Sequence, residues 1–329
     1  MTARHDIAAI GNAIVDVISV ADEAFLAREG LAKGSMALID EARARQLHGR
    51  MAPGVETSGG SAANTVAGAA SLGAKAAFVG KVADDAVGGV FARDLAAIGA
   101  SFDTAPLTGG AATGRCLVNV TADGERTMCT FLGAAVALTA DDVAPATLQA
   151  EKVTYLEGYL FDPPRARRAF AKAAALARGA GRPIALTLSD AFVVERHREA
   201  LLGFIEGQVD ILFANEAELL SLFETADFEA ASVAVAGKVE IAAVTRSAKG
   251  SIVLAGGERH VVAAFPVERV VDTTGAGDQY AAGFLVAFAA GKPLEACARL
   301  GSLAAAEVIS HYGPRPQASL RALAAANGF

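Results

Sequence analysis

The sequence predicts an α/β protein built on a mostly parallel sheet, and three observations support that fold class. From residue 153 onward, short apolar runs alternate with segments of helical spacing, which is the pattern of β-α-β units. Hydrophobic residues make up 53% of the 329 residues, enough for a large buried core. Residues 273–277 form a glycine-rich turn between an apolar strand end at 267–271 and a helical pattern at 279–290, as is common in α/β proteins.

Composition narrows the possible partners. The formal net charge is -7, and no run of basic residues occurs, so neither nucleic acid nor a membrane surface is the expected partner. The three cysteines, at 116, 129 and 297, lack the spacing of a metal site or a disulfide framework, which fits a reduced compartment. The apolar stretch at 7–20 is interrupted by Asp16 and is not followed by a cleavage site. We therefore expect a cytoplasmic protein that binds a small molecule.

Residues 6–20 predict two strands separated by a Gly-Asn break. Asp16 lies among Ile14, Val15, Val17 and Ile18, and an unpaired carboxylate is costly to bury there. Its partner is either a backbone cap or an arginine, or it is a pair of adjacent hydroxyls, since one carboxylate can accept from both.

Short helical and strand-like pieces follow at 22–48, and then a helix of small residues that Ser61 is expected to cap and Gly73 to close. Close packing against a sheet explains the alanines and glycines of that helix. It does not explain Asn64.

Residues 113–130 predict a β-hairpin with its turn at 122–124, and Arg126 begins the second strand. An arginine in that position is more often a solvated charge. Further along, strands are expected at 155–161, 183–189 and 209–215, and helices at 165–180, 191–204 and 216–224.

Asn215 and Glu218 lie where a strand gives way to a helix. Their spacing favours an N-cap with a capping-box glutamate, at the edge where α/β sheets bind ligands. Two further strands surround a turn that contains Ser247 and Gly250. Since no linker or internal repeat interrupts the chain, a single domain is expected.

The turn at 273–277 carries the strongest chemical signal. Gly275 and Gly277 flank Ala276, so the backbone can bring N–H groups at a helix N-terminus close to an anion. Asp278 follows directly. It either complements the helix dipole or takes the proton from a hydroxyl that attacks phosphorus. The turn is neither a Walker loop nor G-x-G-x-x-G.

The stretch D-T-T-G-A-G-D-Q-Y-A-A-G-F-L resembles the C-terminal signature of the ribokinase-like (PfkB) family of carbohydrate and nucleoside kinases, and G-G-S-x-x-N resembles its N-terminal signature. The resemblance extends over essentially the whole chain. It implies a three-layer α/β/α sandwich as one domain over 1–329, with a small β-sheet lid from segments near 14–40 and 108–132. It also implies that Asp278 is the catalytic base.

The resemblance assigns the remaining site residues as well. G-N-A-I-V-D resembles the opening of adenosine kinases, which makes Asp16 the ligand of the ribose hydroxyls and places Arg126 at the transferred phosphate. The substrate residues it implies are Asn12, Asp16, Gly59, Gly60, Asn64 and Asp278. The ATP residues it implies are Asn215, Thr245, Ser247, Gly250, Gly275 and Gly277, with the tail at 311–316 beside the base of ATP. Glu218 is implied to act on Mg²⁺ through a water molecule. Ser247 departs from the family's T-x-G-x-x-G pattern, where a glycine is expected.

The implied function is transfer of the γ-phosphate of ATP to a primary hydroxyl, with Mg²⁺ and with K⁺ left open as an activator. The stretches G-N-x-x-x-D, V-D-I-L-F-x-N-E and L-S-x-x-F favour adenosine as the acceptor. A sugar kinase of the ribokinase, fructokinase or 2-keto-3-deoxygluconate kinase type is the alternative, and a non-catalytic nucleoside-binding protein is a third. A monomer and a homodimer are both compatible with the sequence.

Overall fold

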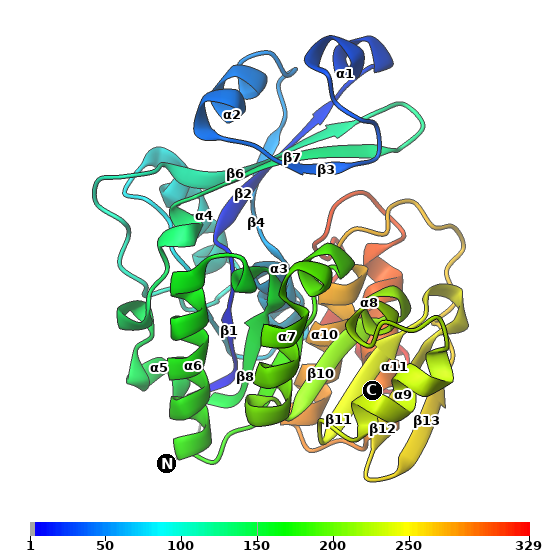
Figure 1. Ribbon diagram of the computed structural model, residues 1–329. Coiled ribbons are helices and arrows are strands. Elements are labelled where there is room, and N and C mark those ends of the chain that lie inside the picture. Colours follow the sequence, from blue (N-terminus) through cyan, green and yellow to red (C-terminus); the bar gives the residue numbers. More distant parts are fainter. Residues whose placement is uncertain (1–3, 150) are drawn as a thin grey trace.

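The computed structural model describes residues 4–149 and 151–329. An eight-stranded sheet forms the centre, in the order β13-β12-β11-β10-β9-β8-β1-β5. A second sheet of five strands, in the order β3-β7-β6-β2-β4, stands above it (Figure 1). This arrangement confirms the predicted α/β fold class.

The large sheet is parallel except at one end. Antiparallel β12 and β13 extend it beyond β11. Its middle strands are buried on both faces, as expected for a parallel sheet covered by helices. The bounds are β1 (His5–Ile10), β5 (Ala76–Val79), β8 (Glu151–Glu157), β9 (Ile184–Thr187), β10 (Ile211–Asn215), β11 (Ile241–Thr245), β12 (Ser251–Ala255) and β13 (Glu258–Val262).

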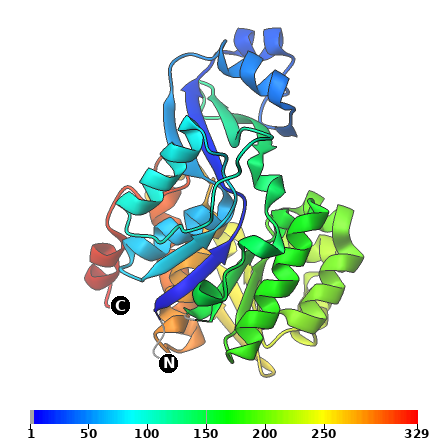
Figure 2. The ribbon, with the colours of Figure 1, turned by 90° about the vertical axis from the view of Figure 1, so that its left-hand side faces the viewer.

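Helices cover both faces of this sheet and give the three layers (Figures 1 and 2). One face carries α5 (Pro145–Leu148), α6 (Pro164–Gly179), α7 (Ala191–Gln208), α8 (Glu216–Leu222) and α9 (Phe228–Ala236). The other carries α3 (Ser61–Ser71), α4 (Ala86–Ala97), α10 (Ala276–Ala289), α11 (Leu294–Val308) and α12 (Leu320–Ala326). Each face has its own apolar core, and Phe170 and Phe284 are fully buried in them.

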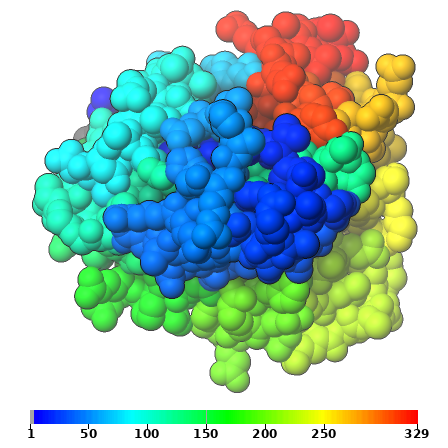
Figure 3. All heavy atoms as spheres, turned by 90° about the horizontal axis from the view of Figure 1, so that it is seen from above, coloured from blue at the N-terminus to red at the C-terminus, as the bar shows by residue number. Residues whose placement is uncertain are grey.

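The second sheet, which we call the lid, consists of β2 (Ile14–Val20), β3 (Met36–Leu38), β4 (Val55–Gly59), β6 (Thr113–Val120) and β7 (Arg126–Gly133). Strands β6 and β7 form the predicted hairpin. Helices α1 (Glu23–Glu29) and α2 (Glu41–His48) pack on the lid through a small core that includes Leu47 and Leu117. Seen from above, the blue N-terminal part of the lid lies over the middle of the molecule, between green body elements and the red C-terminal segments (Figure 3).

Three local predictions were wrong. Residues 267–271 form no strand, because Val271 donates its N–H to Ile309 O at the end of α11 instead of pairing with the sheet. Strand β8 ends at Glu157, and Gly158–Phe161 is a 3-10 turn. Gly60, not Ser61, is the N-cap of α3. The side chain of Ser61 has another partner in the site below.

Membrane-spanning helices and the state of the cysteines can be examined in the described residues. No helix in residues 4–149 and 151–329 is both long enough and apolar enough to cross a membrane. Cys116, Cys129 and Cys297 are buried free thiols.

Candidate active site

A cavity of about 740 Å³ lies between the lid and the carboxyl edge of the large sheet. It brings together residues that are up to 302 positions apart in the sequence, from Asn12 to Pro314. The predicted residues that line it are Asn12, Asp16, Gly60, Asn64, Arg126, Asn215, Glu218, Thr245, Gly275, Ala276, Gly277 and Asp278. Gly59, Ser247 and Gly250 are not among the lining residues.

The glycine-rich turn forms the floor of the cavity. Helix α10 begins at Ala276, so Gly277 and Asp278 lie in its first turn. Gly275 has φ +78°, and a Cβ there would come within 2.6 Å of Pro314 Cα, so only glycine fits. A Cβ on Gly277 would meet nothing within 4 Å. The backbone at Gly277 is therefore open to a ligand, at a helix end that favours anions.

Asp278 is held by two residues of α3. Ser61 Oγ donates to its Oδ1 at 2.6 Å, and Asn64 Nδ2 donates to its Oδ2 at 3.0 Å. The carboxyl group keeps part of its surface open to the cavity. Desolvation raises its pKa to about 6, although both hydrogen bonds lower it. The carboxylate is therefore ionised at neutral pH and is more basic than an exposed aspartate.

Asp16 points from the lid strand β2 toward the same cavity and is buried, at 9% exposure. Within the described residues no hydrogen bond reaches its carboxylate. Burial raises its pKa to about 6, while Arg315 and Arg126 lower it and Asp278 raises it. A Cβ at Gly59 would fall 2.3 Å from Asp16 Cγ, so Gly59 makes room for this carboxylate although it does not line the cavity.

Arg126 begins lid strand β7 and is buried instead of solvated. Its Nε lies 3.1 Å from Asp272 Oδ2 in an ion pair whose side chains are 8% and 5% exposed. Its Nη2 is buried and has no hydrogen-bond partner in the described part of the chain. Nη2 of Arg126 can therefore donate hydrogen bonds to a ligand in the cavity.

Glu157, at the end of β8, is a cavity residue that the sequence reasoning missed. It is 1% exposed and accepts from Asn12 N (3.2 Å), Asn12 Nδ2 (3.0 Å) and Ala62 N (2.8 Å). Burial raises its pKa to about 7 against these hydrogen bonds. It joins the β1–β2 turn to the start of α3. A lone glutamate in the apolar run Y-L-E-G-Y-L-F was the available signal.

The capping interpretation of Asn215 and Glu218 is confirmed. Asn215 Oδ1 accepts from Glu218 N at 2.8 Å, and Glu218 Oε2 accepts from Asn215 N at 2.9 Å. Glu218 Oε1 accepts from Asn215 Nδ2 at 2.7 Å. Burial raises the pKa of Glu218 to about 7. Both side chains also line the cavity, so the cap leaves them within reach of a ligand.

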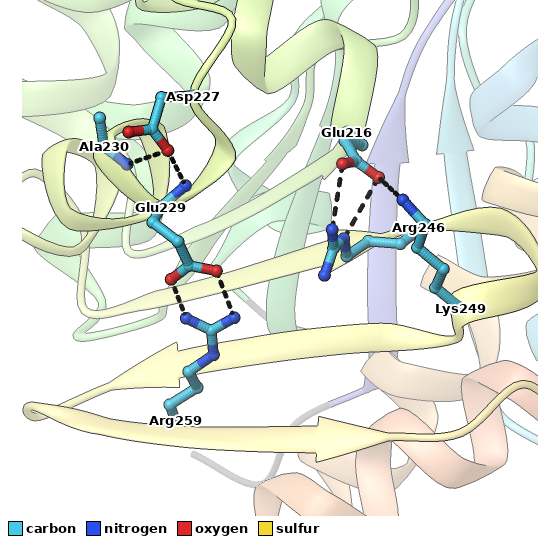
Figure 4. A network of polar contacts seen from close by, with 7 residues as sticks. All are labelled: Glu216, Asp227, Glu229, Ala230, Arg246, Lys249 and Arg259. Carbon is cyan, nitrogen blue, oxygen red and sulfur yellow. Dashed lines mark hydrogen bonds and ion pairs between the residues drawn. The ribbon is translucent and has the colours of Figure 1, made fainter.

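The turn after β11 adopts a conformation that usually needs glycine. Ser247 has φ +52°, so this serine occupies the left-handed region. Gly250 has φ +81°, and a Cβ there would lie 2.0 Å from Val262 O. Arg246 anchors the turn, because it pairs with Glu216 (Figure 4). Its guanidinium also stacks 3.8 Å over the Phe228 ring.

One wall of the cavity is apolar. Phe192, at the start of α7, is 67% exposed and lines the cavity. The lid contributes Met36 and Leu38, which are 44% and 56% exposed, and also Val118 and Met128. Exposed aromatic and aliphatic side chains that converge on one cavity offer a planar apolar group a place to stack.

Comparison with known proteins identifies the family. The model of the pfkB family carbohydrate kinases matches residues 4–320. The crystal structure of adenosine kinase from Sinorhizobium meliloti superposes with a TM-score of 0.93 and 51% identity, over 99% of this chain and 100% of that one. The crystal structure of a probable sugar kinase protein from Rhizobium etli CFN 42 gives 0.94 and 48%, over 99% of both chains.

A cytidine kinase from Thermococcus kodakarensis is 39% identical over 119 residues, which are 35% of this chain and 42% of that protein. Its alignment thus spans less than half of that relative. Kinases of this family transfer phosphate to an alcohol group, and they generally use ATP and Mg²⁺. With the family model covering nearly the whole sequence and the G-A-G-D turn at the floor of the cavity, this chain belongs to the pfkB family of carbohydrate kinases.

Proposed function

We propose that the protein transfers the γ-phosphate of ATP to a primary hydroxyl of a nucleoside, and that adenosine is the acceptor. The observation that carries this proposal is Asp278, a carboxylate in the first turn of α10 that opens onto the cavity. A hydroxyl beside it can lose its proton to Oδ1 or Oδ2 while its oxygen attacks phosphorus. Ser61 and Asn64 fix the carboxylate for that step.

The acceptor binds between Asp16 and Asp278 in this proposal. Asp16 has no protein hydrogen-bond donor in the described residues, so its two oxygens can accept from the two adjacent hydroxyls of a ribose. Asn12, Gly60 and Asn64 supply the neighbouring surface, and Gly59 leaves the space that Asp16 needs.

The transferred phosphate lies at the start of α10. The backbone N–H groups of Gly275 and Gly277 face developing charge there, and such preorganised donors act strongly where water is excluded. The Ala276 N–H between them donates to Thr273 O at 3.2 Å and holds the turn in shape. Arg126 adds a cation from the lid, through the buried Nη2 that has no described partner.

ATP extends along the other half of the cavity, past Asn215, Thr245 and Gly277. Ser247 and Gly250 shape the adjoining turn. No cluster of three metal-binding side chains occurs in residues 4–149 and 151–329. Mg²⁺ would therefore take few of its ligands from the protein. Magnesium commonly keeps several waters and binds substrate phosphates, and Glu218 would hold one such water. Whether K⁺ activates the enzyme is tested in the assay below.

The apolar wall favours a nucleoside over a free sugar. Phe192 exposes 67% of its surface beside the cavity, and Met36 and Leu38 of the lid line the same space. A base can stack on these groups and bury them, with an aromatic contact worth about 0.5–1.5 kcal/mol beyond area burial. A free sugar has no base and would leave these apolar side chains exposed to water. The similarity to the adenosine kinase from Sinorhizobium meliloti supports the same choice.

Two alternative functions would use the same cavity. A sugar kinase is suggested by the 48% identity with the probable sugar kinase from Rhizobium etli. A nucleoside-binding protein without catalysis would also use Asp16 and Phe192, but it would have no need of the Asp278 arrangement.

The test is product formation from ATP and Mg²⁺ with adenosine, cytidine, ribose, fructose and 2-keto-3-deoxygluconate in turn, each with and without K⁺. Adenosine should give AMP with the highest kcat/KM. A sugar with the highest kcat/KM would support the sugar kinase. Adenosine binding measured by calorimetry, with no ATP turnover on any acceptor, would support the binding protein.

A further inference from the structure

The C-terminal segment at 311–318 is pinned against the active site on both sides of Arg315. Glu307 Oε1 accepts from Gln317 N at 3.0 Å and from Ala318 N at 2.7 Å. On the other side, Pro314 O accepts from Gln279 Nε2 at 3.0 Å. These contacts fix the backbone that carries Arg315, so its side chain enters the site from a rigid support.

Arg315 does not line the cavity itself, but it contacts Asn64, which does. Its Nε donates to Asn64 Oδ1 at 3.4 Å, and Asn64 Nδ2 donates to Asp278 Oδ2 at 3.0 Å. The amide of Asn64 thus has a cationic donor on its oxygen and a carboxylate on its nitrogen. With Arg315 in place the reverse orientation is unfavourable, because the amide oxygen would then face Asp278 and the amide nitrogen would face Arg315.

Arg315 also supplies charge to Asp16. Among the neighbouring charges, Arg315 is the strongest influence that lowers the pKa of Asp16, and Arg126 acts in the same direction. Asp278 opposes both, and the neutral Cys116 thiol lies on the adjacent strand. Arg315 Nη2 is buried with no partner in the described residues. The guanidinium of Arg315 is therefore held through Nε, while its Nη2 donors have no described acceptor.

We propose that Arg315 is a positioning residue of the acceptor site, which orients the Asn64 amide toward Asp278 and adds a positive charge to the surroundings of Asp16. The inference rests on the proposed function, since it makes Arg315 a support for the acceptor half of the same cavity. An ionised Asp16 accepts from two hydroxyls, whereas a protonated one must donate from one of its oxygens. Losing Arg315 would therefore weaken acceptor binding more than ATP binding.

The experiment compares wild-type protein with R315Q and R315K, and with R168Q as a matched control at an exposed arginine of α6. The first measurement needs no turnover: it follows the Asp16 carboxyl carbon by NMR as a function of pH, with D16N to assign the signal. In R315Q the apparent pKa of Asp16 should rise by roughly one pH unit or more. R315K and R168Q should titrate close to wild type.

The second measurement is steady-state kinetics with adenosine and ATP varied separately. In R315Q the KM for adenosine should rise roughly tenfold or more, while the KM for ATP should stay within about twofold. R315K keeps the charge but lacks Nε, so its adenosine KM should rise while Asp16 titrates normally. If R315Q does not fold, R315K still tests the positioning role, because an adenosine KM equal to that of wild type would reject it.

The outcomes separate the two proposals. If R315Q matches R168Q in both the Asp16 titration and the adenosine KM, the role of Arg315 is rejected, and a lowered Tm alone would leave it a packing residue. If wild-type protein turns over no acceptor, the proposed function fails. A displaced Asp16 titration in R315Q would then still support the electrostatic role of Arg315, and an undisplaced one would reject it.

Discussion

Arg126 and Asp272 form a buried ion pair between the lid and the segment that leads into α10, with Nε 3.1 Å from Oδ2. Asp272 also accepts from Thr274 N at 3.0 Å and from Gly313 N at 2.9 Å. One carboxylate therefore connects a lid strand, the glycine-rich turn and the C-terminal segment. The position of the lid over the cavity and the conformation of the glycine-rich turn are therefore coupled through Asp272.

Asp272→Asn should destabilise the protein strongly. The substitution leaves the Arg126 charge buried without its anion, and breaking a buried pair in this way costs about 3–5 kcal/mol. Urea unfolding measures the loss. Glu229→Gln is the control, since it breaks the exposed pair with Arg259 shown in Figure 4, where water screens the charges and little stability should be lost. Equal small losses in both variants would contradict the coupling.

Arg126→Lys tests the chemistry of the same residue. The lysine keeps the charge but lacks the planar fork that can bond a phosphate while still pairing with Asp272. If the lid arginine acts on the phosphate in transit, kcat should fall more than either KM rises. Wild-type turnover in this variant, confirmed under single-turnover conditions, would leave Arg126 with a purely structural role.

Asp16→Asn should raise stability at high pH and lower acceptor affinity. Because the pKa of Asp16 is about 6 in the folded protein and near 3.9 when unfolded, the native state binds more protons between these values. Wild-type stability therefore falls as pH rises through this window, by up to about 3 kcal/mol. The variant should be more stable than wild type at pH 8 and equal to it at pH 4. Equal stability at both pH values would contradict the shift.

The same substitution separates stability from function. Adenosine affinity measured by calorimetry should weaken roughly tenfold or more, because a hydrogen-bonding group in a closed site is left without its partner. ATP affinity should stay unchanged. Unaltered adenosine affinity would show that Asp16 is structural.

Hydrophobic periodicity predicted most of the helices and strands, because this signal lies within each element's own sequence. The hairpin that contains Arg126 and the capping box of Asn215 and Glu218 were both evident from spacing. The errors occurred where tertiary contacts decide. Residues 267–271 look like a strand by composition, but Val271 pairs with Ile309 at a helix end. No local pattern contains that partner.

The site residues also differ in whether a local sequence pattern marks them. Asp16 and Asp278 were conspicuous because each carboxylate interrupts apolar or small residues. Arg315 was hidden in the tail, since nothing in H-Y-G-P-R-P indicates that its side chain reaches Asn64, 251 positions earlier. Ser61 looked like a helix cap, yet its hydroxyl donates to Asp278, because Gly60 holds the cap with φ +96°.

Ser247→Gly should stabilise the protein slightly and leave ATP binding intact. Ser247 has φ +52°, which costs a residue with a Cβ about 1–2 kcal/mol. Glycine removes that strain but gains about 0.4–1 kcal/mol of freedom in the unfolded chain, so a net gain of up to about 1 kcal/mol remains. Gly250→Ala is the contrast, since its Cβ would lie 2.0 Å from Val262 O. Thermal unfolding should move in opposite directions for the two variants.

Asp278→Asn separates catalysis from helix stabilisation. The amide keeps the size of the side chain and can still accept from Ser61 Oγ, but it cannot take a proton, so kcat should fall by about 10² to 10⁴. Adenosine and ATP should still bind. In wild-type protein kcat should rise as pH increases through about 6 and then level off, because only the ionised carboxylate is a base.

Ser61→Ala is the companion variant to Asp278→Asn. It removes a hydrogen bond that lowers the pKa of Asp278, so the acid limb of kcat should move to higher pH while the high-pH plateau is largely kept. If Asp278 served only the helix dipole, its loss would cost about 0.3–1 kcal/mol of stability and leave transfer alone. Single-turnover phosphoryl transfer measured beside thermal unfolding decides between the two roles. Near-normal transfer in Asp278→Asn would rule out the general base and leave the phosphate turn to act by positioning and charge alone.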